Sequence, residues 1–277
     1  MRVSRLLKEP GTLIMGILNV TPDSFFDGGS YFDLESAVNY AHQMVDEGAD
    51  IIDIGGESSR PGADPVSLEE EEKRVMPVLE RLISEVEISI SVDTYKSTIA
   101  KKALEIGAQI INDISGLRFD SDMANVVAEH DCHVVIMHMK GSPKDMQLNP
   151  TYFDLISELV EFFEERIAHA SSQGISGDKI ILDPGIGFGK RVEDNFDIIR
   201  ELESIVELGY PVLVGPSRKT FLSKTLNLPF EDLIEGTSAA VTASIINGAK
   251  IVRVHDVKEM KRVVTVADTF QKSRVLA

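Results

Sequence analysis

The sequence predicts an α/β protein with a single (β/α)₈ barrel spanning residues 1–277. Eight short apolar runs have the length and composition of strands, and helix-like segments and glycine stops lie among them. Because parallel strands need long crossover connections, this alternation favours a parallel sheet. The runs are continuously apolar, which indicates burial on both faces. An open doubly wound sheet is the alternative, but eight strands in 277 residues favour the closed TIM barrel.

The first half of the chain supplies four of the expected strands, at residues 12–20, 51–54, 88–94 and 110–114. A polar loop over residues 21–33 follows the first strand, and it is long for a compact α/β unit. An amphipathic helix then begins at Leu34 and stops at Gly48. A second helix is expected over residues 67–84, and a third is closed by Gly107.

The second half repeats the pattern, with strands expected at residues 133–139, 180–182, 211–217 and 251–255. Helices are expected over residues 152–172, 218–226 and 235–247. Three Gly-Ala pairs begin at Gly48, Gly107 and Gly248, and each follows a helical segment and precedes a strand. This loose internal echo is consistent with one repeating structural unit.

Composition indicates which binding partners and which cellular compartment to expect. A formal charge of −17 argues against nucleic acid and against anionic membrane surfaces, which select for basic proteins. Cys132 is the single cysteine, which excludes a disulfide framework and fits a reducing compartment. The N-terminal segment becomes polar at residues 9–11, and no apolar run reaches membrane-spanning length. We therefore expect a cytoplasmic protein.

The sixth strand leads into a glycine-rich segment, Asp183-Pro-Gly-Ile-Gly-Phe-Gly-Lys190. A carboxylate at the end of a buried strand is costly unless something binds it, and glycines let backbone approach a ligand closely. An Asp that caps the next helix beside a glycine-rich turn explains this segment alone equally well. A P-loop is excluded, because Pro184 and Arg191 stand where that motif needs Gly and Ser or Thr.

The same arrangement recurs along the chain. The active site of a barrel of this kind lies at the carboxyl ends of its strands, where polar or charged groups follow all eight predicted strands. The residues at those ends are Asn19, Ser59, Arg60, Asp93, Asn112, Met137, His138, Asp183, Lys219, Arg253 and His255. Capping and turn formation explain one or two such residues, whereas a full ring predicts a ligand with several hydrogen-bonding edges.

The ring divides into two chemical sets. Asp93, Asn112 and Asp183 suit a flat heterocycle with amino and ring N–H donors, because carboxylates accept parallel N–H bonds and an amide both donates and accepts. The cationic set predicts a phosphate-type anion, although a solvated rim charge is the alternative for each member alone. Its members are Arg60, Arg253 and His255, with Lys190 as a candidate addition.

Asn19 is a candidate oxygen ligand for Mg²⁺, which favours few protein ligands together with substrate phosphates. A turn cap is the alternative for an Asn at this position. Cys132 and His133 lack metal-ligand spacing, so no zinc site is expected, and no nucleophile-elbow pattern surrounds the loop serines. Residues 69–72, four consecutive glutamates, are expected to form the solvated first turn of a helix.

Five segments carry a resemblance to a known family. They are residues 19–29 (NVTPDSFFDGG), 56–63 (GESSRPGA), 183–190 (DPGIGFGK), 217–219 (SRK) and 253–255 (RVH). They resemble the signature segments of the dihydropteroate synthases, in the same order and over essentially the whole chain. The resemblance implies a transferase of folate biosynthesis that condenses (7,8-dihydropterin-6-yl)methyl diphosphate with 4-aminobenzoate to give 7,8-dihydropteroate and diphosphate.

The resemblance also implies residue roles. The expected catalytic residues are Asp27, Arg60 and Lys219. The expected pterin-binding residues are Asp93, Asn112, Met137, Asp183, Phe188, Lys219 and Arg253. The expected diphosphate-binding residues are Asn19, Ser59, Arg60, Arg253, Val254 and His255, with Asn19 also the ligand of Mg²⁺. The expected 4-aminobenzoate-binding residues are Phe25, Ser59, Pro61 and Lys219.

The chain departs from the family pattern at two positions. Ser59 stands where Thr is usual, which keeps the hydroxyl and predicts an altered fit around 4-aminobenzoate and its sulfonamide analogues. Phe26 stands where a small residue is more familiar. The family's habit implies a homodimer, and the last helix is a candidate for its apolar face. The residues of that face would be Val263, Val264, Val266 and Ala267.

Two rival functions share the pterin-binding set. A methyltetrahydrofolate corrinoid methyltransferase has no use for a diphosphate site, so the cationic set counts against it. A non-catalytic pterin-binding paralogue is expected to lose the long-loop residues, whereas Asp27, Arg60 and Lys219 are all present in this chain.

Overall fold

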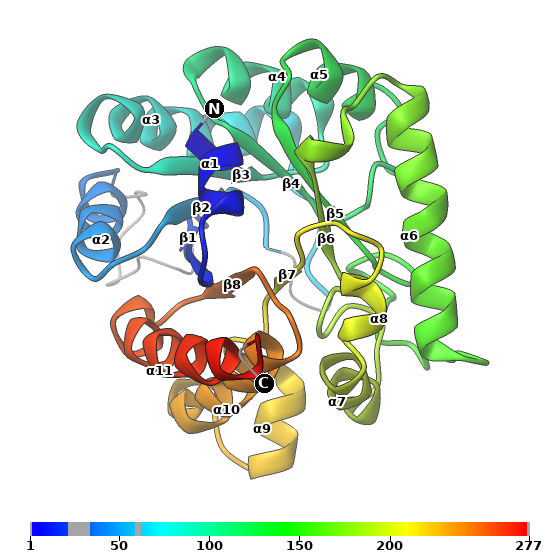
Figure 1. The fold of residues 1–277 in the computed structure, drawn as a ribbon. Helices are drawn as coiled ribbons and strands as arrows, with labels where there is room; N and C mark the ends of the chain where they lie inside the picture. The colour runs from blue at the N-terminus through cyan, green and yellow to red at the C-terminus, as the bar shows by residue number, and fades with distance from the viewer. Residues whose placement is uncertain (1, 22–33, 59–61, 276–277) are drawn as a thin grey trace.

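The computed structural model describes residues 2–21, 34–58 and 62–275 (Figure 1). It confirms the predicted barrel: eight parallel strands lie in the order β6-β5-β4-β3-β2-β1-β8-β7. A parallel bridge between Leu182 and Val212 joins the two ends of that order, so the sheet closes on itself. The open doubly wound alternative is therefore wrong.

All eight predicted strands are present. Their bounds are β1 Leu13–Asn19, β2 Ile51–Gly55, β3 Ser89–Asp93, β4 Ile110–Asp113, β5 His133–Met137, β6 Ile180–Asp183, β7 Leu213–Val214 and β8 Ile251–Val254. The seventh strand is much shorter than the expected residues 211–217. Pro211 and Pro216 flank it, and neither has the backbone N–H that a strand ladder requires.

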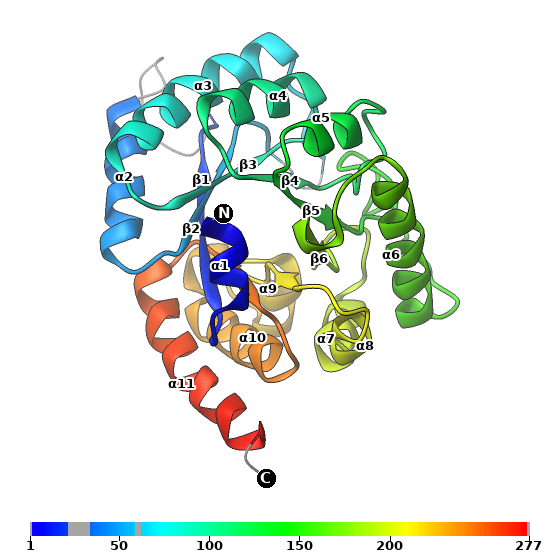
Figure 2. The ribbon, with the colours of Figure 1, turned by 45° about the horizontal axis from the view of Figure 1, so that its top comes forward.

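Helices cover the outside of the barrel (Figure 2). Their bounds are α2 Leu34–Asp46, α3 Leu68–Glu85, α4 Ser97–Ile106, α5 Met123–Glu129, α6 Leu155–Ser172, α7 Val192–Arg200, α8 Glu203–Val206, α9 Thr220–Leu226, α10 Ile234–Ile246 and α11 Val257–Val275. Gly48, Gly107 and Gly248 take φ values of 101°, 130° and 100°, which favour glycine. Each follows a helix and precedes a strand, as the Gly-Ala pairs predicted. No helix in the described part of the chain is long and apolar enough to span a membrane.

The inside of the barrel changes character along its axis. At the amino-terminal end, the short helix α1 (Arg2–Lys8) inserts Val3 into an apolar cluster, and Figure 2 shows α1 over the centre of the strand ring. The strand residues of that cluster are Leu13, Met15, Ile51, Ile110, Val135, Ile181, Leu213 and Ile251. Because side chains alternate along a strand, positions two or more residues further on point inward nearer the carboxyl ends. Polar residues occupy several of those positions and form the floor of a site, which Met137 and Gly215 also line.

The glutamate run at residues 69–72 is only partly the solvated turn that was expected. Ser67 caps α3 through its hydroxyl, which accepts a hydrogen bond from the backbone N–H of Glu70 at 3.2 Å. Glu71, however, is 1% exposed and forms an ion pair with Lys96. Positions three and four residues apart share a helix face, and Glu71 lies on the buried face with Val75 and Leu79.

Candidate active site

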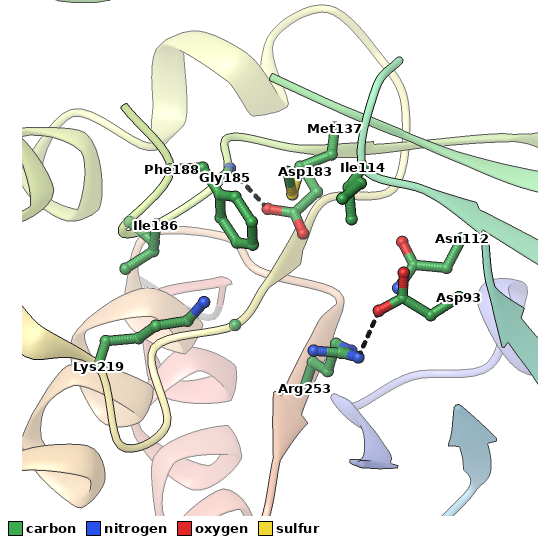
Figure 3. A pocket seen from close by; sticks show the side chains of 11 residues that line it. Asp93, Asn112, Ile114, Met137, Asp183, Gly185, Ile186, Phe188, Lys219 and Arg253 are labelled. Carbon is green, nitrogen blue, oxygen red and sulfur yellow. Dashed lines mark hydrogen bonds and ion pairs between the residues drawn. The ribbon is translucent and has the colours of Figure 1, made fainter. Parts of the chain in front are cut away.

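A pocket opens at the carboxyl ends of the strands, where the sequence predicted the site (Figure 3). Its lining residues are Asp93, Asn112, Ile114, Met137, Asp183, Gly185, Ile186, Phe188, Gly215, Lys219 and Arg253. Strand register brings the polar ones together, since Asp93 pairs with Asn112 across β3 and β4, and Met137 pairs with Asp183 across β5 and β6. All seven residues predicted from the sequence to bind pterin therefore line one pocket.

Asn112 and Asp183 are buried acceptors on its floor, at 3% and 6% exposure. Asp183 Oδ1 accepts a hydrogen bond from the backbone N–H of Gly185 at 2.7 Å. No described residue donates to Asn112 Oδ1. Burial raises the pKa of Asp183 to about 6, although the bond from Gly185 and the cations of Lys219 and Arg253 act against burial. A ligand with N–H donors would satisfy both side chains.

Arg253 is held between two carboxylates. Its Nε donates to Asp53 Oδ2 at 2.7 Å, and its Nη2 donates to Asp93 Oδ2 at 2.8 Å. Burial raises the pKa of Asp93, the guanidinium opposes that change, and the charge of Asp53 adds to it. Arg253 is thus part of the pocket floor and is neutralised there by Asp53 and Asp93.

Asp53, which contacts two pocket residues, was not identified from the sequence. It lies in the middle of β2 and is fully buried, and its Oδ2 also accepts from Asn112 Nδ2 at 2.9 Å. A search restricted to strand ends does not identify Asp53, because it precedes the end of its strand by two residues. The available signal was a charged residue inside an otherwise apolar run, which is rare unless the charge is paired.

Lys219 enters the pocket from the loop after β7, and its Nζ lies 4.3 Å from the centroid of the Phe188 ring. Burial lowers the pKa of Lys219 to about 8, and the neighbouring charge of Arg253 also lowers it. The preceding residue, Arg218, takes a left-handed φ of 53° and pairs with Asp256 outside the pocket. This turn directs Arg218 and Lys219 to different places, and of these two residues only Lys219 lines the pocket.

The glycine loop after β6 is packed backbone to backbone against the segment after β5. A Cβ atom on Gly185 would collide with the carbonyl oxygen of His138, and one on Gly189 would collide with that of Lys140. Gly185 and Gly189 also take positive φ values of 68° and 63°. The glycines therefore serve close backbone approach, as predicted, but the partner is the neighbouring loop.

Lys190 does not join the cationic set. It is 3% exposed, and its Nζ lies 3.0 Å from both His138 Nδ1 and the carbonyl oxygen of Phe188. Burial lowers the pKa of Lys190 to about 7. The ring of His138 packs edge-on against Phe162, with centroids 4.8 Å apart, and does not line the pocket. These residues fasten the glycine loop to the segment after β5.

The other predicted positions that the structure describes lie at or beside the carboxyl ends of β1 and β8 and do not line the pocket. Ser217 Oγ and His255 Nδ1 are 3.0 Å apart, which orients the imidazole. Val254 is fully buried and packs into the apolar layer between strands and helices, so its side chain faces away from the pocket. Asn19 ends β1 in register with Gly55, which is itself in register with Asp93. Phe25, Phe26, Asp27, Ser59, Arg60 and Pro61 lie outside the described residues.

A charged cluster anchors the start of the second long loop, residues 56–67 between β2 and α3. Glu57 is the second residue of that loop, and its carboxylate accepts from Lys96 Nζ at 2.6 Å and from the Tyr95 hydroxyl at 2.8 Å. Lys96 also pairs with the buried Glu71. The loop that carries Ser59 and Arg60 therefore begins from a fixed point on the β3–α4 connection.

The chain matches the family of pterin binding enzymes over residues 15–255, which spans all eight strands apart from the start of β1. It is 48% identical to the dihydropteroate synthase of Bacillus subtilis, over 96% of this chain and 91% of the relative. The structure of a Clostridium difficile dihydropteroate synthase, determined in the presence of pteroic acid, is 45% identical. It superposes with a TM-score of 0.89, over 94% of this chain and 97% of that one. A Yersinia pestis dihydropteroate synthase in complex with a sulfonamide drug superposes with a TM-score of 0.90 at 40% identity, over 95% of each chain.

Proposed function

The chain belongs to the dihydropteroate synthase family, and we propose how its residues divide the work of the family's reaction. The enzyme condenses (7,8-dihydropterin-6-yl)methyl diphosphate with 4-aminobenzoate to form 7,8-dihydropteroate and release diphosphate. The pocket floor is the observation that best supports this assignment of roles. There, the buried acceptors of Asn112 and Asp183 lie between apolar walls.

The floor binds the pterin edge. A dihydropterin offers an amino group and ring N–H groups in one plane, and ionised carboxylates only accept hydrogen bonds. Asp183 takes two of these donors in parallel, while Asn112 Oδ1 and Asp93 take others. The unsatisfied state of Asn112 Oδ1 supports this assignment, because buried acceptors are rarely left without a donor.

Apolar walls complete the pterin site. Met137 and Phe188 are 2% and 7% exposed and line the pocket on either side of Asp183 (Figure 3). Such surfaces bury the flat faces of a heterocycle, and the polar floor fixes its orientation. Lys219, held over the Phe188 ring, contributes a cation at the edge where the pterin and 4-aminobenzoate sites meet.

The chemistry requires no protein nucleophile. The dihydropterin ring shares the positive charge that develops when the CH₂–O bond breaks, so the protein mainly has to stabilise the departing diphosphate. We assign that task to Ser59, Arg60 and His255, together with Asn19 and the backbone of Val254. Arg253, already paired with Asp53 and Asp93, holds the pterin floor beside the leaving group.

Mg²⁺ fits the residues at the end of β1. Gly55 has no side chain between Asn19 and Asp93: a Cβ placed on it would lie 3.7 Å from Asn19 Oδ1 and 3.9 Å from Asp93 Oδ2. No group of three or more His, Cys, Asp or Glu side chains able to hold a metal occurs among the described residues. Mg²⁺ commonly binds one or two protein oxygens and completes its shell with substrate phosphates and water. When bound to Asn19, the ion would neutralise charge on the diphosphate.

The two long loops supply the second substrate site. We assign the binding of 4-aminobenzoate to Phe25, Ser59, Pro61 and Lys219, as the family resemblance implies. We assign the charges at the reacting centre to Asp27 and Arg60 on the same ground. Closure of the loops would exclude water and protect the pterin cation from hydrolysis. The Yersinia pestis relative forms a complex with a sulfonamide drug, which supports sulfonamides as ligands of this chain as well.

We also propose a homodimer and a cytoplasmic location. The apolar face predicted on α11 is wrong in part, because Val264 and Ala267 are already buried in this chain's own core. Val266 of that face remains exposed, as does Phe270 on the same helix. Large apolar side chains are also exposed on and after α7 and α9. They are Phe196, Leu226, Leu228 and Phe230. These surfaces support a dimer through that side of the barrel, and the buried single thiol of Cys132 and the net charge support a cytoplasmic enzyme without nucleic-acid or membrane partners.

Release of diphosphate from the dihydropterin substrate tests these roles, measured with and without 4-aminobenzoate and with and without Mg²⁺. Release that depends on 4-aminobenzoate and is stimulated by Mg²⁺ is expected. Release unaffected by chelation of Mg²⁺ would contradict the role of Asn19. Pterin binding without release would instead favour the non-catalytic paralogue.

A further inference from the structure

Asp53 lies directly beneath the pocket without lining it. It is fully buried in the barrel interior, and one of its oxygens, Oδ2, accepts both from Asn112 Nδ2 at 2.9 Å and from Arg253 Nε at 2.7 Å. Both donors belong to pocket-lining residues. A single buried carboxylate thus touches two members of the pterin floor from below.

This contact decides which end of the Asn112 amide faces the ligand. An amide can be turned over at little cost when its surroundings accept both orientations, but an ionised carboxylate accepts hydrogen bonds and cannot donate one. Asp53 therefore selects the orientation in which Nδ2 points down to it. Asn112 Oδ1 is left towards the pocket, where no described residue donates to it.

The same carboxylate fixes Arg253. The guanidinium is a rigid plane, and it is held at Nε by Asp53 and at Nη2 by Asp93. Two contacts on one plane leave the group little freedom to rotate. Asp53 and Asp93 also share this one cation, so the charge of Asp53 acts on the ionisation of Asp93.

We propose that Asp53 is a positioning residue for pterin recognition: it turns the Asn112 amide so that its oxygen receives a ring N–H of the substrate, and it locks Arg253 against Asp93. The inference rests on the proposed assignment of the pocket floor to the pterin. It predicts that Asp53 acts on substrate affinity through Asn112, without touching the substrate itself.

The variant Asp53→Asn tests the inference. An amide at this position can donate as well as accept. Its oxygen can take the place of Oδ2 for both donors, but its N–H₂ group then lies where Oδ1 has no partner, and it also permits the reversed orientation of the Asn112 amide. In either arrangement Arg253 loses the charged acceptor of its Nε. Arg253 keeps Asp93 as a partner, so we expect the variant to fold. Affinity for the dihydropterin diphosphate, measured by calorimetry, should fall by about tenfold or more, as loss of a hydrogen bond to a charged group implies.

Asp268→Asn is the matched control. Asp268 also accepts two hydrogen bonds, from the backbone N–H and the hydroxyl of Thr12 at 3.1 and 2.7 Å, but Thr12 precedes β1 at the opposite end of the barrel. This variant loses the same charge and should keep wild-type affinity. Equal losses in the two variants would show a general effect of charge or stability and would overturn the inference.

A double-mutant cycle with Asn112→Ala separates positioning from general structural support. If Asp53 acts largely through Asn112, most of the loss caused by Asp53→Asn should disappear when Asn112 is already Ala. Fully additive losses would overturn the proposal. Asp53→Ser replaces Asp53→Asn in the cycle if the latter lacks a cooperative thermal transition.

The pH dependence of binding gives a readout that a structural role would not move. The charge of Asp53 helps to raise the pKa of Asp93 to about 7, above the pKa of about 6 at Asp183. Without that charge, Asp93 should ionise at lower pH, so the upper part of the acid limb of dihydropterin binding, near pH 7, should shift to lower pH in Asp53→Asn. An unshifted limb would contradict the coupling. Wild-type protein that neither binds the dihydropterin nor releases diphosphate would refute the assignment of the pocket, whereas wild-type binding with unchanged Asp53→Asn affinity would refute the role of Asp53 alone.

Discussion

The Nζ of Lys219 lies 4.3 Å from the centroid of the Phe188 ring, and the two residues come from loops after different strands. The ring face attracts the cation and holds it at the pocket edge. A contact of this kind contributes about 0.5–2 kcal/mol, depending on desolvation. Phe188→Leu should therefore weaken dihydropterin binding by about 2- to 30-fold, whereas Phe188→Tyr, which keeps the ring, should bind nearly as wild type. Calorimetric affinities equal in the Leu and Tyr variants would rule out the ring–cation contact as the cause.

Gly185→Ala should destabilise the protein more than Gly209→Ala. Both residues have positive φ, 68° and 84°, so each substitution carries the left-handed cost of about 1–2 kcal/mol. Only Gly185 would drive its new Cβ into the His138 carbonyl, since nothing lies within 4 Å of a Cβ on Gly209. Overpacking adds about 1–3 kcal/mol. Urea unfolding measures both, and equal losses would mean that the loop relaxes freely.

Glu57→Gln should loosen the start of the second long loop, because its carboxylate accepts hydrogen bonds from Lys96, Tyr95 and the backbone N–H of Val66. Since that loop carries Ser59 and Arg60, we expect kcat to fall several-fold while dihydropterin affinity changes little. Glu72→Gln, which breaks an exposed ion pair with Lys102, is the control and should leave both unchanged. Equal loss of affinity and turnover in Glu57→Gln would place Glu57 in ground-state binding.

The buried His138 should lower the free energy of unfolding in acid. Burial and the charges of Lys190, Arg118 and Lys140 lower its pKa to about 2. Below its ordinary pKa of about 6.5, the unfolded chain binds a proton that the folded protein does not, so stability falls as pH falls. From pH 7.5 to 5.5 this contributes about 1.4 kcal/mol, which His138→Gln should not show. Urea unfolding at both pH values compares the two proteins, and identical pH dependence would refute the prediction.

The barrel was largely predictable from the sequence, because burial on both faces makes each strand a continuous apolar run, and glycines mark the helix ends. The seventh strand was overestimated because apolar content, by which residues 211–217 were assigned, does not report hydrogen bonding. Pro211 and Pro216 reduce its ladder to Leu213–Val214. Helices α5, α7 and α8 were not assigned from the sequence, and each is nine residues or shorter.

The pocket residues that lie at strand ends, such as Asp93, Asn112 and Asp183, could be predicted from the sequence. Positions that depend on side-chain direction were harder. Lys190 follows the glycine loop and resembles a ligand cation in sequence, yet its ammonium bonds to His138 and to a backbone carbonyl. Asp53 was missed because its role comes from contacts across three strands, which no local pattern records.

Calorimetric titration of Asp183→Asn with the dihydropterin diphosphate tests the central claim, that the buried carboxylate of Asp183 reads the pterin edge. Wild-type affinity should be lost in the variant, and its melting temperature should stay at or above that of wild type, because an amide oxygen can still accept from Gly185 without a buried charge. Wild-type affinity should itself fall as the pH drops below about 6, where Asp183 takes up a proton. Retained tight binding by a folded Asp183→Asn protein would contradict the account.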